Sequence, residues 1–352
     1  MSVATPALAP LDIVGLGLCT PLGLTARLTQ VEVSAGSVRF VMTGVEGPRG
    51  DEVRASVQPL LDAGLTRSER MEALAVTALE DCLREAPPLG AGPLPLVLAL
   101  PEPEVGARVD EAAVSRAILE QGARWRLQLA SGGLLRTGRA AFFQALHRAG
   151  ELLTTRGAPW VLVGAVDSLC DRDSLRLLAE AGRTLGGPNR DGLLPGEGAG
   201  FVLLTRAGTR GMRVLGQVLG SALAEDPHSF RHGGPPLGDG LTEAFRKLRT
   251  DSVAGARRMN FFLSCQPPEA FWGREFVHAY LRNSALLPEP LTGQGIAESL
   301  GEPGAAAGVI QVGMALHARG SWGEARPGAW RTLVFGSSDG GAVGACVVEV
   351  RV

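Results

Sequence analysis

The chain alternates continuous apolar runs with longer segments in which apolar residues recur every three or four positions. In the first half, runs short enough to be buried strands occur at 11–24, 93–101, 125–131 and 159–168. Segments with a helical period lie at 66–86 and 139–157. Thr66 or Ser68 is placed to cap the first of these helices. Strands that alternate with helices predict a parallel or mixed sheet covered by helices.

The second half repeats this organisation. Strand-like runs occur at 214–223, 259–265, 331–338 and 339–350, and helical periods at 241–250, 271–283 and 304–320. Each half ends in a glycine-rich turn followed by an apolar strand, at 191–207 and 339–350. A repeat of this length indicates duplication of a whole α/β unit. We therefore divide the chain into an N-terminal half, residues 1–207, and a C-terminal half, residues 208–352.

Composition and charge exclude several functions. Charged residues make up 20% of the 352 residues and hydrophobic residues 45%, as in a globular protein. The net charge is −2 and no extended run of Lys or Arg occurs, so we expect no nucleic-acid partner and no membrane surface. No apolar run is long enough to span a membrane and no secretion signal is recognised, so we expect a cytoplasmic protein.

The five cysteines and five histidines do not predict a metal site. No CxxC pair occurs, and His228 and His232 lie four residues apart in a loop rich in proline and glycine. The segment 337–345 is rich in glycine but has neither the GxGxxG nor the GxxxxGKS/T spacing of a phosphate-binding loop. We therefore expect no metal, no cofactor and no disulfide framework.

Four blocks, in order along the chain, resemble the β-ketoacyl synthases of the thiolase superfamily. They are "IVGLGLCTPLGL" (13–24), "GAVDS" (164–168), "RDGLLPGEGAGFVLL" (190–204) and "VFGSSDGGAVGACVV" (334–348). A further segment, "GEPGAAAG" (301–308), is similar to the "GHxxAAAG" segment of that family. The resemblance implies an α/β fold of five layers, α-β-α-β-α, built from two duplicated halves. It also implies a homodimer or a dimer of paralogues.

The family's catalytic triad of one Cys and two His is absent from the positions that the resemblance indicates. The nucleophile position falls on Arg139, with Ala140 as the neighbouring register. The first His position falls on Cys265 or a neighbour, and the second falls on Glu302. A guanidinium is not a nucleophile, and a carboxylate repels a developing oxyanion. We therefore expect no condensing activity.

Three residues leave other chemistry open. Cys265 is either a relocated nucleophile, accompanied by His278 and Glu302, or a small buried hydrophobic residue, which we favour. Glu302 is either an acid or base in a cleft or a cap at the start of a helix, and we favour the cap. Glu197 is either a general base or part of a structural glycine-rich turn, and we favour the turn.

A ketosynthase relative without a triad is expected to act by binding. The resemblance suggests two classes of partner. A chain-length factor pairs with an active synthase paralogue and an acyl carrier protein, whereas a thiolase-like accessory protein of type VI secretion pairs with an effector or adaptor, and we favour the latter. Trp272, Arg274 and Tyr280 are a candidate partner surface, with packing in the core as the default. The alternatives are an acyltransferase with rebuilt catalysis and a sensor that binds acyl thioesters without turnover.

Overall fold

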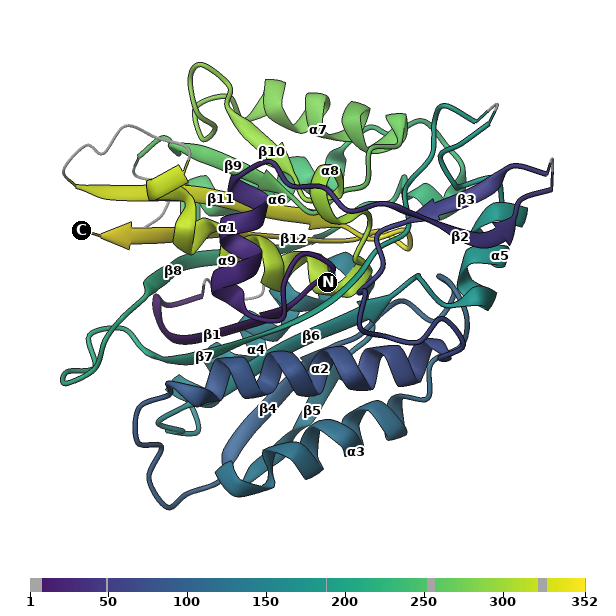
Figure 1. Cartoon of the computed structure of the whole chain (residues 1–352). Coiled ribbons are helices and arrows are strands. Elements are labelled where there is room, and N and C mark those ends of the chain that lie inside the picture. Colours follow the sequence, from purple (N-terminus) through teal and green to yellow (C-terminus); the bar gives the residue numbers. More distant parts are fainter. Residues whose placement is uncertain (1–7, 49, 188, 252–256, 322–327, 352) are drawn as a thin grey trace.

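Two sets of strands with the same internal order form the framework of the molecule (Figure 1). The computed structural model describes residues 8–48, 50–187, 189–251, 257–321 and 328–351. The strands are β1 (Leu11–Cys19), β2 (Val41–Glu46), β3 (Glu52–Ala55), β4 (Leu94–Ala99), β5 (Leu127–Leu135), β6 (Val161–Ser168), β7 (Glu197–Arg206), β8 (Gly216–Glu225), β9 (Phe261–Ser264), β10 (Gly293–Gly295), β11 (Ala329–Ser337) and β12 (Ala342–Arg351). The α-helices are α1 (Ala26–Ser34), α2 (Arg67–Arg84), α3 (Glu111–Gln121), α4 (Ala141–Thr154), α5 (Arg172–Glu180), α6 (Asp239–Asp251), α7 (Ala270–Arg282), α8 (Ala297–Leu300) and α9 (Ala307–Ser321).

The strand order shows the duplication that the sequence predicts. The N-terminal set has the order β5-β4-β6-β7-β1 and the C-terminal set the order β10-β9-β11-β12-β8. In both sets the first two pairings are parallel and the last two are antiparallel. The two sets are joined by a short antiparallel pairing between Leu11–Ile13 of β1 and Gly216–Val218 of β8. The predicted boundary after residue 207 falls in the connection between β7 and β8, and it stays a prediction.

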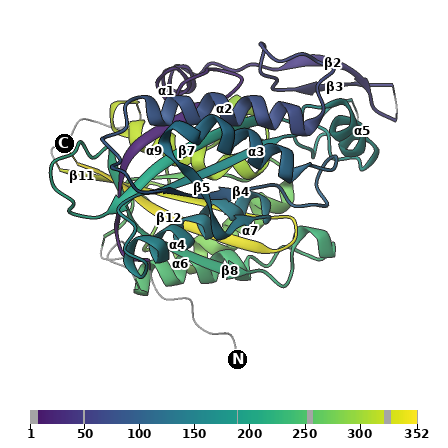
Figure 2. The same ribbon diagram turned by 90° about the horizontal axis from the view of Figure 1, so that it is seen from below.

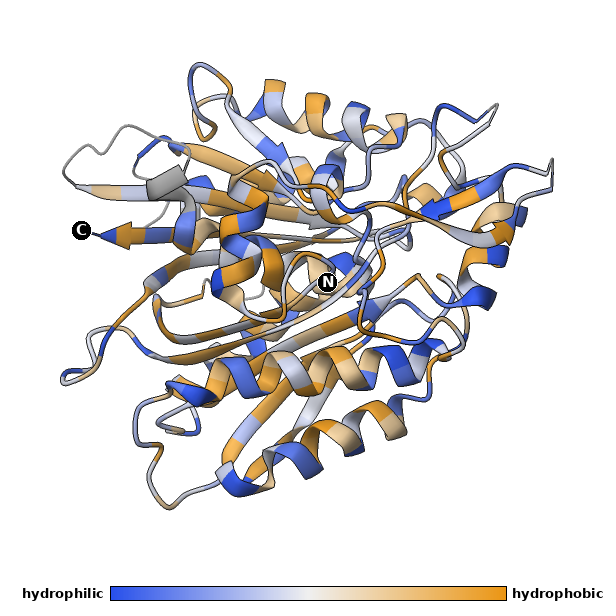
Figure 3. Cartoon of the chain, viewed as in Figure 1, coloured by the Kyte–Doolittle hydropathy of each residue, from blue (hydrophilic) through white to orange (hydrophobic). Residues whose placement is uncertain are grey.

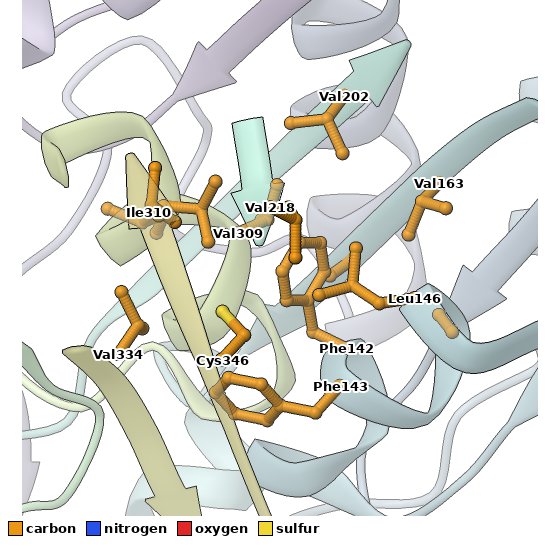
Figure 4. Packing of buried hydrophobic residues seen from close by; sticks show 14 of the residues in the cluster. Phe142, Phe143, Leu146, Val163, Val202, Val218, Val309, Ile310, Val334 and Cys346 are labelled. Atoms are coloured by element: carbon orange, nitrogen blue, oxygen red, sulfur yellow. The ribbon is translucent and has the colours of Figure 1, made fainter. Parts of the chain in front are cut away.

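Helices occupy three layers around the two sets of strands (Figures 1 and 2). In one core cluster α2 and α3 pack on the outer face of the N-terminal set, and in another α6 and α7 pack on the outer face of the C-terminal set. The third cluster places α4 and α9 between the sets. Figure 4 shows Phe142, Phe143 and Leu146 of α4 among side chains from both sets. The predicted arrangement of five layers, α-β-α-β-α, built from two duplicated halves is confirmed.

Local sequence explains how closely these layers pack. Of the two predicted caps, Thr66 is the one that caps α2, because its side chain accepts from the backbone N–H of Glu69 while the Glu69 carboxylate accepts from the N–H of Thr66. α2 then lies directly against β1 at Gly17, where an added Cβ would come within 2.2 Å of the backbone of α2. The glycines of β1 thus set the distance between a helix and the sheet.

Several elements were not predicted from the sequence. They are α1, the β2–β3 hairpin, α3, α5 and the short elements β10 and α8. Most of these elements are short. The predicted helix 304–320 is present as α9, and a 3-10 turn at Gly304–Ala306 precedes it. Among the described residues, none of the helices combines the length and apolar character needed to cross a membrane.

Candidate functional site

Arg139 lies where α4 begins, between the two halves. Its side chain is 5% exposed. Nε donates to the carbonyl oxygen of Ser337 at 2.7 Å, and Nη2 donates to Oδ1 of Asp339 at 2.6 Å. Nη1 lies 3.4 Å from Oε1 of Glu302, and the guanidinium lies 4.5 Å from the ring centre of Trp272. The predicted nucleophile position is therefore the centre of a buried ionic network.

A second arginine completes this network. Arg183 donates to Oδ2 of Asp339 and forms a fork with both carboxylate oxygens of Glu269, at 3.0 and 2.7 Å. The indole N–H of Trp272 donates to Glu269 at 3.0 Å. Burial opposes the charge of Asp339, but the adjacent guanidinium groups of Arg139 and Arg183 hold its pKa below the ordinary value. The network joins residues of the two halves through charge-assisted hydrogen bonds.

Glu102 extends the network towards the surface. Its carboxylate oxygens accept from the backbone N–H groups of Asp339 and Gly340, at 2.8 and 2.9 Å. Arg231, which is partly exposed, donates to Glu102 at 2.8 Å. Burial raises the pKa of Glu102, and Arg139 and Arg231 oppose that rise. The turn between β11 and β12 is therefore held by one buried carboxylate.

Glu302 has one paired carboxylate oxygen and one unpaired. Oε1 accepts from the backbone N–H of Gly304 at 3.0 Å, which is the helix-start contact that the sequence favours. Oε2 is buried and has no partner among the described atoms. Burial raises the pKa of Glu302 to about 7, although the Arg139 guanidinium opposes this rise. Burial at this position therefore favours the neutral form of the acid.

Backbone donors at the start of α4 and α9 are already engaged by side chains. The N–H of Ala140 donates to Oγ of Ser338 at 2.9 Å. The N–H of Ala305 donates to Oδ2 of Asp167 at 3.0 Å. An oxyanion hole needs such donors directed at the reacting atom. Here they are satisfied within the chain.

The cavity at this position is very small. Its volume is about 10 Å³. It is lined by Glu102, Val105, Gly138, Arg139, Asp167, Leu169, Arg183, Leu193, Glu302 and Gly304. A cavity of about 10–15 Å³ is the smallest that holds one water molecule. An acyl thioester does not fit in it.

A much larger cleft lies on the other side of Glu102. Its volume is about 860 Å³, and it is formed by the end of β4 and the starts of α2 and α3. Arg67 lines it and is bound to Asp167 at 2.7 Å. Several carboxylates, among them Glu69 and Asp110, lie along it. Glu102 lines both spaces and so separates the open cleft from the closed cavity.

Cys265 is close to this site but is packed as a core residue. It is 0% exposed, and burial raises the pKa of its thiol well above the ordinary value. An added Cβ on Gly336 would lie 2.9 Å from Cys265 and 3.5 Å from Arg139, so these three residues are neighbours. His278 is exposed on α7, and the described contacts do not join it to Cys265. The thiol is not in the thiolate form that a nucleophile needs.

The three candidate residues on α7 differ in their exposure to solvent. Trp272 is 1% exposed and lies beneath Arg139, so it belongs to the interior. Tyr280 is half-buried against the outer helix layer, and Arg274 is exposed. The reason is that α7 buries Trp272, Glu275 and Ala279 along one face. Of the three predicted residues, Arg274 alone has an exposed side chain.

Glu197 is held in a fully buried pair. Its two oxygens accept from Arg70 at 2.7 and 2.8 Å, and they also accept from the N–H of Gln58 and the hydroxyl of Ser168. Every one of these contacts is internal, which agrees with a structural turn.

Within the described ranges, no group of three or more His, Cys, Asp or Glu residues is arranged to hold a metal ion.

Sequence reasoning missed most of the ionic network. The residues that it did not identify are Glu102, Arg183, Arg231, Glu269 and Asp339. One signal was present, because a charged residue inside a turn of small residues, as in "SSDGG", needs a buried partner. The partners themselves lie in distant loops that no local pattern connects.

The duplicated five-layered architecture, with α4 and α9 between the strand sets, is the thiolase-like fold of the β-ketoacyl synthases. The ishigamide ketosynthase/chain length factor shares it with a TM-score of 0.73 and 20% identity, over 98% of this chain and 100% of that one. A type II polyketide ketosynthase in complex with its acyl carrier protein, AntDE:AntF, has a TM-score of 0.77 and 14% identity, over 98% and 100% of the two chains.

A third solved structure is the ketosynthase from module 6 of the bacillaene synthase of Bacillus subtilis 168. Its TM-score is 0.75 at 14% identity, and the match covers 97% of this chain and 72% of that one. No protein-family model matches the chain, and no curated protein matches it. At these identities the likeness shows the fold, and the function has to be argued from the site.

Proposed function

We propose that this chain is a ketosynthase-fold protein without condensing activity that acts by pairing with another protein, in the manner of a chain-length factor beside an active ketosynthase. The observation that carries the proposal is the buried network around Arg139. It occupies the nucleophile position and leaves a cavity of about 10 Å³.

The chemistry of condensation fails at each step in this site. Arg139 has no lone pair for attack on a thioester. The N–H groups of Ala140 and Ala305 are engaged by side chains. Glu302 places an acid with a buried, unpaired oxygen where the family stabilises negative charge. Groups that act as a unit in catalysis do not retain activity when all of them are replaced.

The neighbouring structures support a protein partner. One is a ketosynthase/chain length factor, and another is a ketosynthase in complex with its acyl carrier protein. β5 is the last strand of its set and offers an edge, but residues 130–133 interrupt its pairing with β4. An interrupted edge resists continuous strand pairing, so the partner contact is expected to rest on side chains.

Other partners named from the sequence remain predictions. They are a type VI secretion effector or adaptor, a homodimer, and an acyltransferase role through Cys265. A cytoplasmic location also stays a prediction.

Activity and pairing are tested together. The chain is assayed for condensation of an acyl thioester with malonyl-acyl carrier protein by product mass, alone and after co-expression with a ketosynthase from its source genome. We expect no product from the chain alone, a stable heterodimer by size exclusion, and product only when the partner has its own cysteine. Product from the chain alone that is lost in Cys265→Ala overturns the proposal.

A further inference from the structure

The connection between β8 and α6 is a loop whose two ends lie together. At its start, the carboxylate of Asp226 accepts from the backbone N–H of His228 at 2.8 Å and from that of Gly240, in the first turn of α6, at 3.0 Å. The N–H of Asp226 donates to the carbonyl oxygen of Gly341 at 2.7 Å. Compact loops with joined ends are Ω-loops, which frequently serve a function. We call residues 227–238 the β8–α6 loop.

The tip of the β8–α6 loop covers two side chains of the buried ionic network. The ring of Phe230 stacks on the ring of Trp272, with the ring centres 5.3 Å apart. The guanidinium of Arg183 lies 4.4 Å from the centre of the Phe230 ring. Beneath this tip the side chain of Arg183 is 14% exposed and Trp272 is 1% exposed. The tip therefore shields this part of the network from water.

Arg231 ties the tip to the segment that follows β4. Its Nη2 atom lies 2.8 Å from Oε2 of Glu102 and 3.2 Å from Oε2 of Glu104. Its backbone N–H donates to the carbonyl oxygen of Asp339 at 3.0 Å. The side chains of Arg231 and Glu104 are 43% and 59% exposed. Because water and salt screen half-exposed charges, these ion pairs hold the tip only weakly.

The β8–α6 loop takes no part in the hydrophobic core. All of residues 227–238 are described, and none of them belongs to a core cluster. The clusters lie mainly on the strands and on the helices packed against them, where Figure 3 shows most of the hydrophobic positions. A segment with few buried apolar contacts opens more readily than the core does. We therefore expect this loop to open while the two halves stay folded.

We propose that the β8–α6 loop is a lid on the buried ionic network, hinged at Asp226 and closed in this structure. When Arg231 releases its two carboxylate partners, Phe230 leaves Arg183 and Trp272, and this part of the network becomes accessible to solvent. The base of the loop stays in place, because the hydrogen bonds of Asp226 do not involve the tip. This inference goes beyond the proposed function, because it concerns access to the network and does not depend on a partner.

Hydrogen exchange followed by NMR tests the lid, because it measures each N–H group separately. One reporter is the backbone N–H of residue 231, and the other is the indole N–H of Trp272, which donates to Glu269 at 3.0 Å beneath the lid. The reference is the backbone of the fully buried strand β6. We expect both reporters to exchange about tenfold or more faster than β6. Low concentrations of urea should change their exchange little, because local opening exposes little surface.

Two variants separate opening of the lid from a general loss of stability. Arg231→Ala removes the ion pairs that close the lid and should speed the exchange of both reporters about fivefold, after correction for the intrinsic rate of the new residue. Arg258→Ala is the matched control, because the guanidinium of Arg258 is 41% exposed and lies 2.8 Å from Oε2 of Glu289. That pair joins the segments before β9 and β10 and stays intact when the lid opens. The control should therefore leave the two reporters unchanged.

Three results overturn the proposal. If exchange of the reporters follows that of β6 at every urea concentration, the loop opens only when the whole protein unfolds. If Arg258→Ala speeds the reporters as much as Arg231→Ala does, the ion pairs at the tip do not close a lid. If Arg231→Ala speeds exchange at residue 231 but not at the indole of Trp272, the loop moves without uncovering the network.

Discussion

Two buried ionic clusters in this protein differ in how completely their groups are paired. In the N-terminal half, Arg70 and Glu197 are both 0% exposed and are joined by two hydrogen bonds. The remaining contacts of Glu197 come from Gln58 and Ser168. This cluster is a closed pair of opposite charges.

The cluster around Arg139 is larger, and it contains more carboxyl groups than guanidinium groups. It contains the carboxyl groups of Glu102, Glu269, Glu302 and Asp339 against the guanidinium groups of Arg139, Arg183 and Arg231. The mismatch appears at Glu302, whose second oxygen is unpaired. Buried ion pairs fix geometry more than they add stability. The first cluster thus holds a turn with its charges paired, whereas the second fills the position of the expected catalytic residues and leaves one carboxylate oxygen unpaired.

Removing Arg70 is expected to have the largest effect. Arg70→Met leaves the Glu197 carboxylate buried without its partner, which costs about 3–5 kcal/mol in the free energy of unfolding. Urea unfolding at pH 8 measures this loss. Arg84→Met, at an exposed position on the same helix, is the control and should stay within about 0.5 kcal/mol of the wild type. Equal stability of the two variants would mean that the pair is not structural.

Removing Arg139 is expected to lower the free energy of unfolding by less than removing Arg70 does. In Arg139→Met, Asp339 keeps Arg183, and Glu302 is able to take a proton. The loss should be about 1–3 kcal/mol and should be greater at pH 8 than at pH 6, because loss of the guanidinium raises the pKa of Glu302 further. Unfolding at the two pH values measures it. The same loss at both values would contradict the coupling between Arg139 and Glu302.

Glu302→Gln is expected to change the free energy of unfolding least, and to raise it where the two arginine variants lower it. The pKa of Glu302 is raised from 4.5 to about 7 in the folded state. The folded state therefore binds the proton more tightly than the unfolded state. The contribution of Glu302 to the free energy of unfolding is fully present below about pH 4.5 and is lost as the pH rises through 7. At pH 8 the variant should be more stable than the wild type by about 1–2 kcal/mol.

The pH dependence separates Glu302 from other buried acids. Burial also raises the pKa of Glu275 to about 7, but Glu275 is present in both proteins and cancels in the difference. The difference in unfolding free energy between the wild type and Glu302→Gln should grow from pH 5 to pH 8. Parallel curves over that range would show that Glu302 is ionised throughout.

Much of the fold could be predicted from the sequence because its signals are local. Continuous apolar runs identified the strands, and the duplicated glycine-rich turns identified the repeat. α1 and the β2–β3 hairpin were missed because α1 has two apolar faces, which blurs the helical period. The hairpin strands are short and largely exposed, so they lack a buried run.

The site was predicted as positions but not as an arrangement. The structure brings Arg139 to Glu302 and places Cys265 beside both Gly336 and Arg139. It does not bring His278 into contact with Cys265 among the described residues. Trp272 packs in the core, which was the default expectation, and the alternative of a surface role arose because Glu275, a charged residue on the buried face of α7, disguises the period of that helix. The side chain of Glu275 accepts a hydrogen bond from Gln266, which lies in the loop after β9.

The most direct test of the closed site is the mass of the intact protein after incubation with short and long acyl-CoA thioesters, with any adduct mapped by peptide digestion. The cavity volume and the buried, protonated Cys265 predict an unchanged mass. A stoichiometric acyl adduct on Cys265 would contradict the account and make this protein an enzyme with a relocated nucleophile.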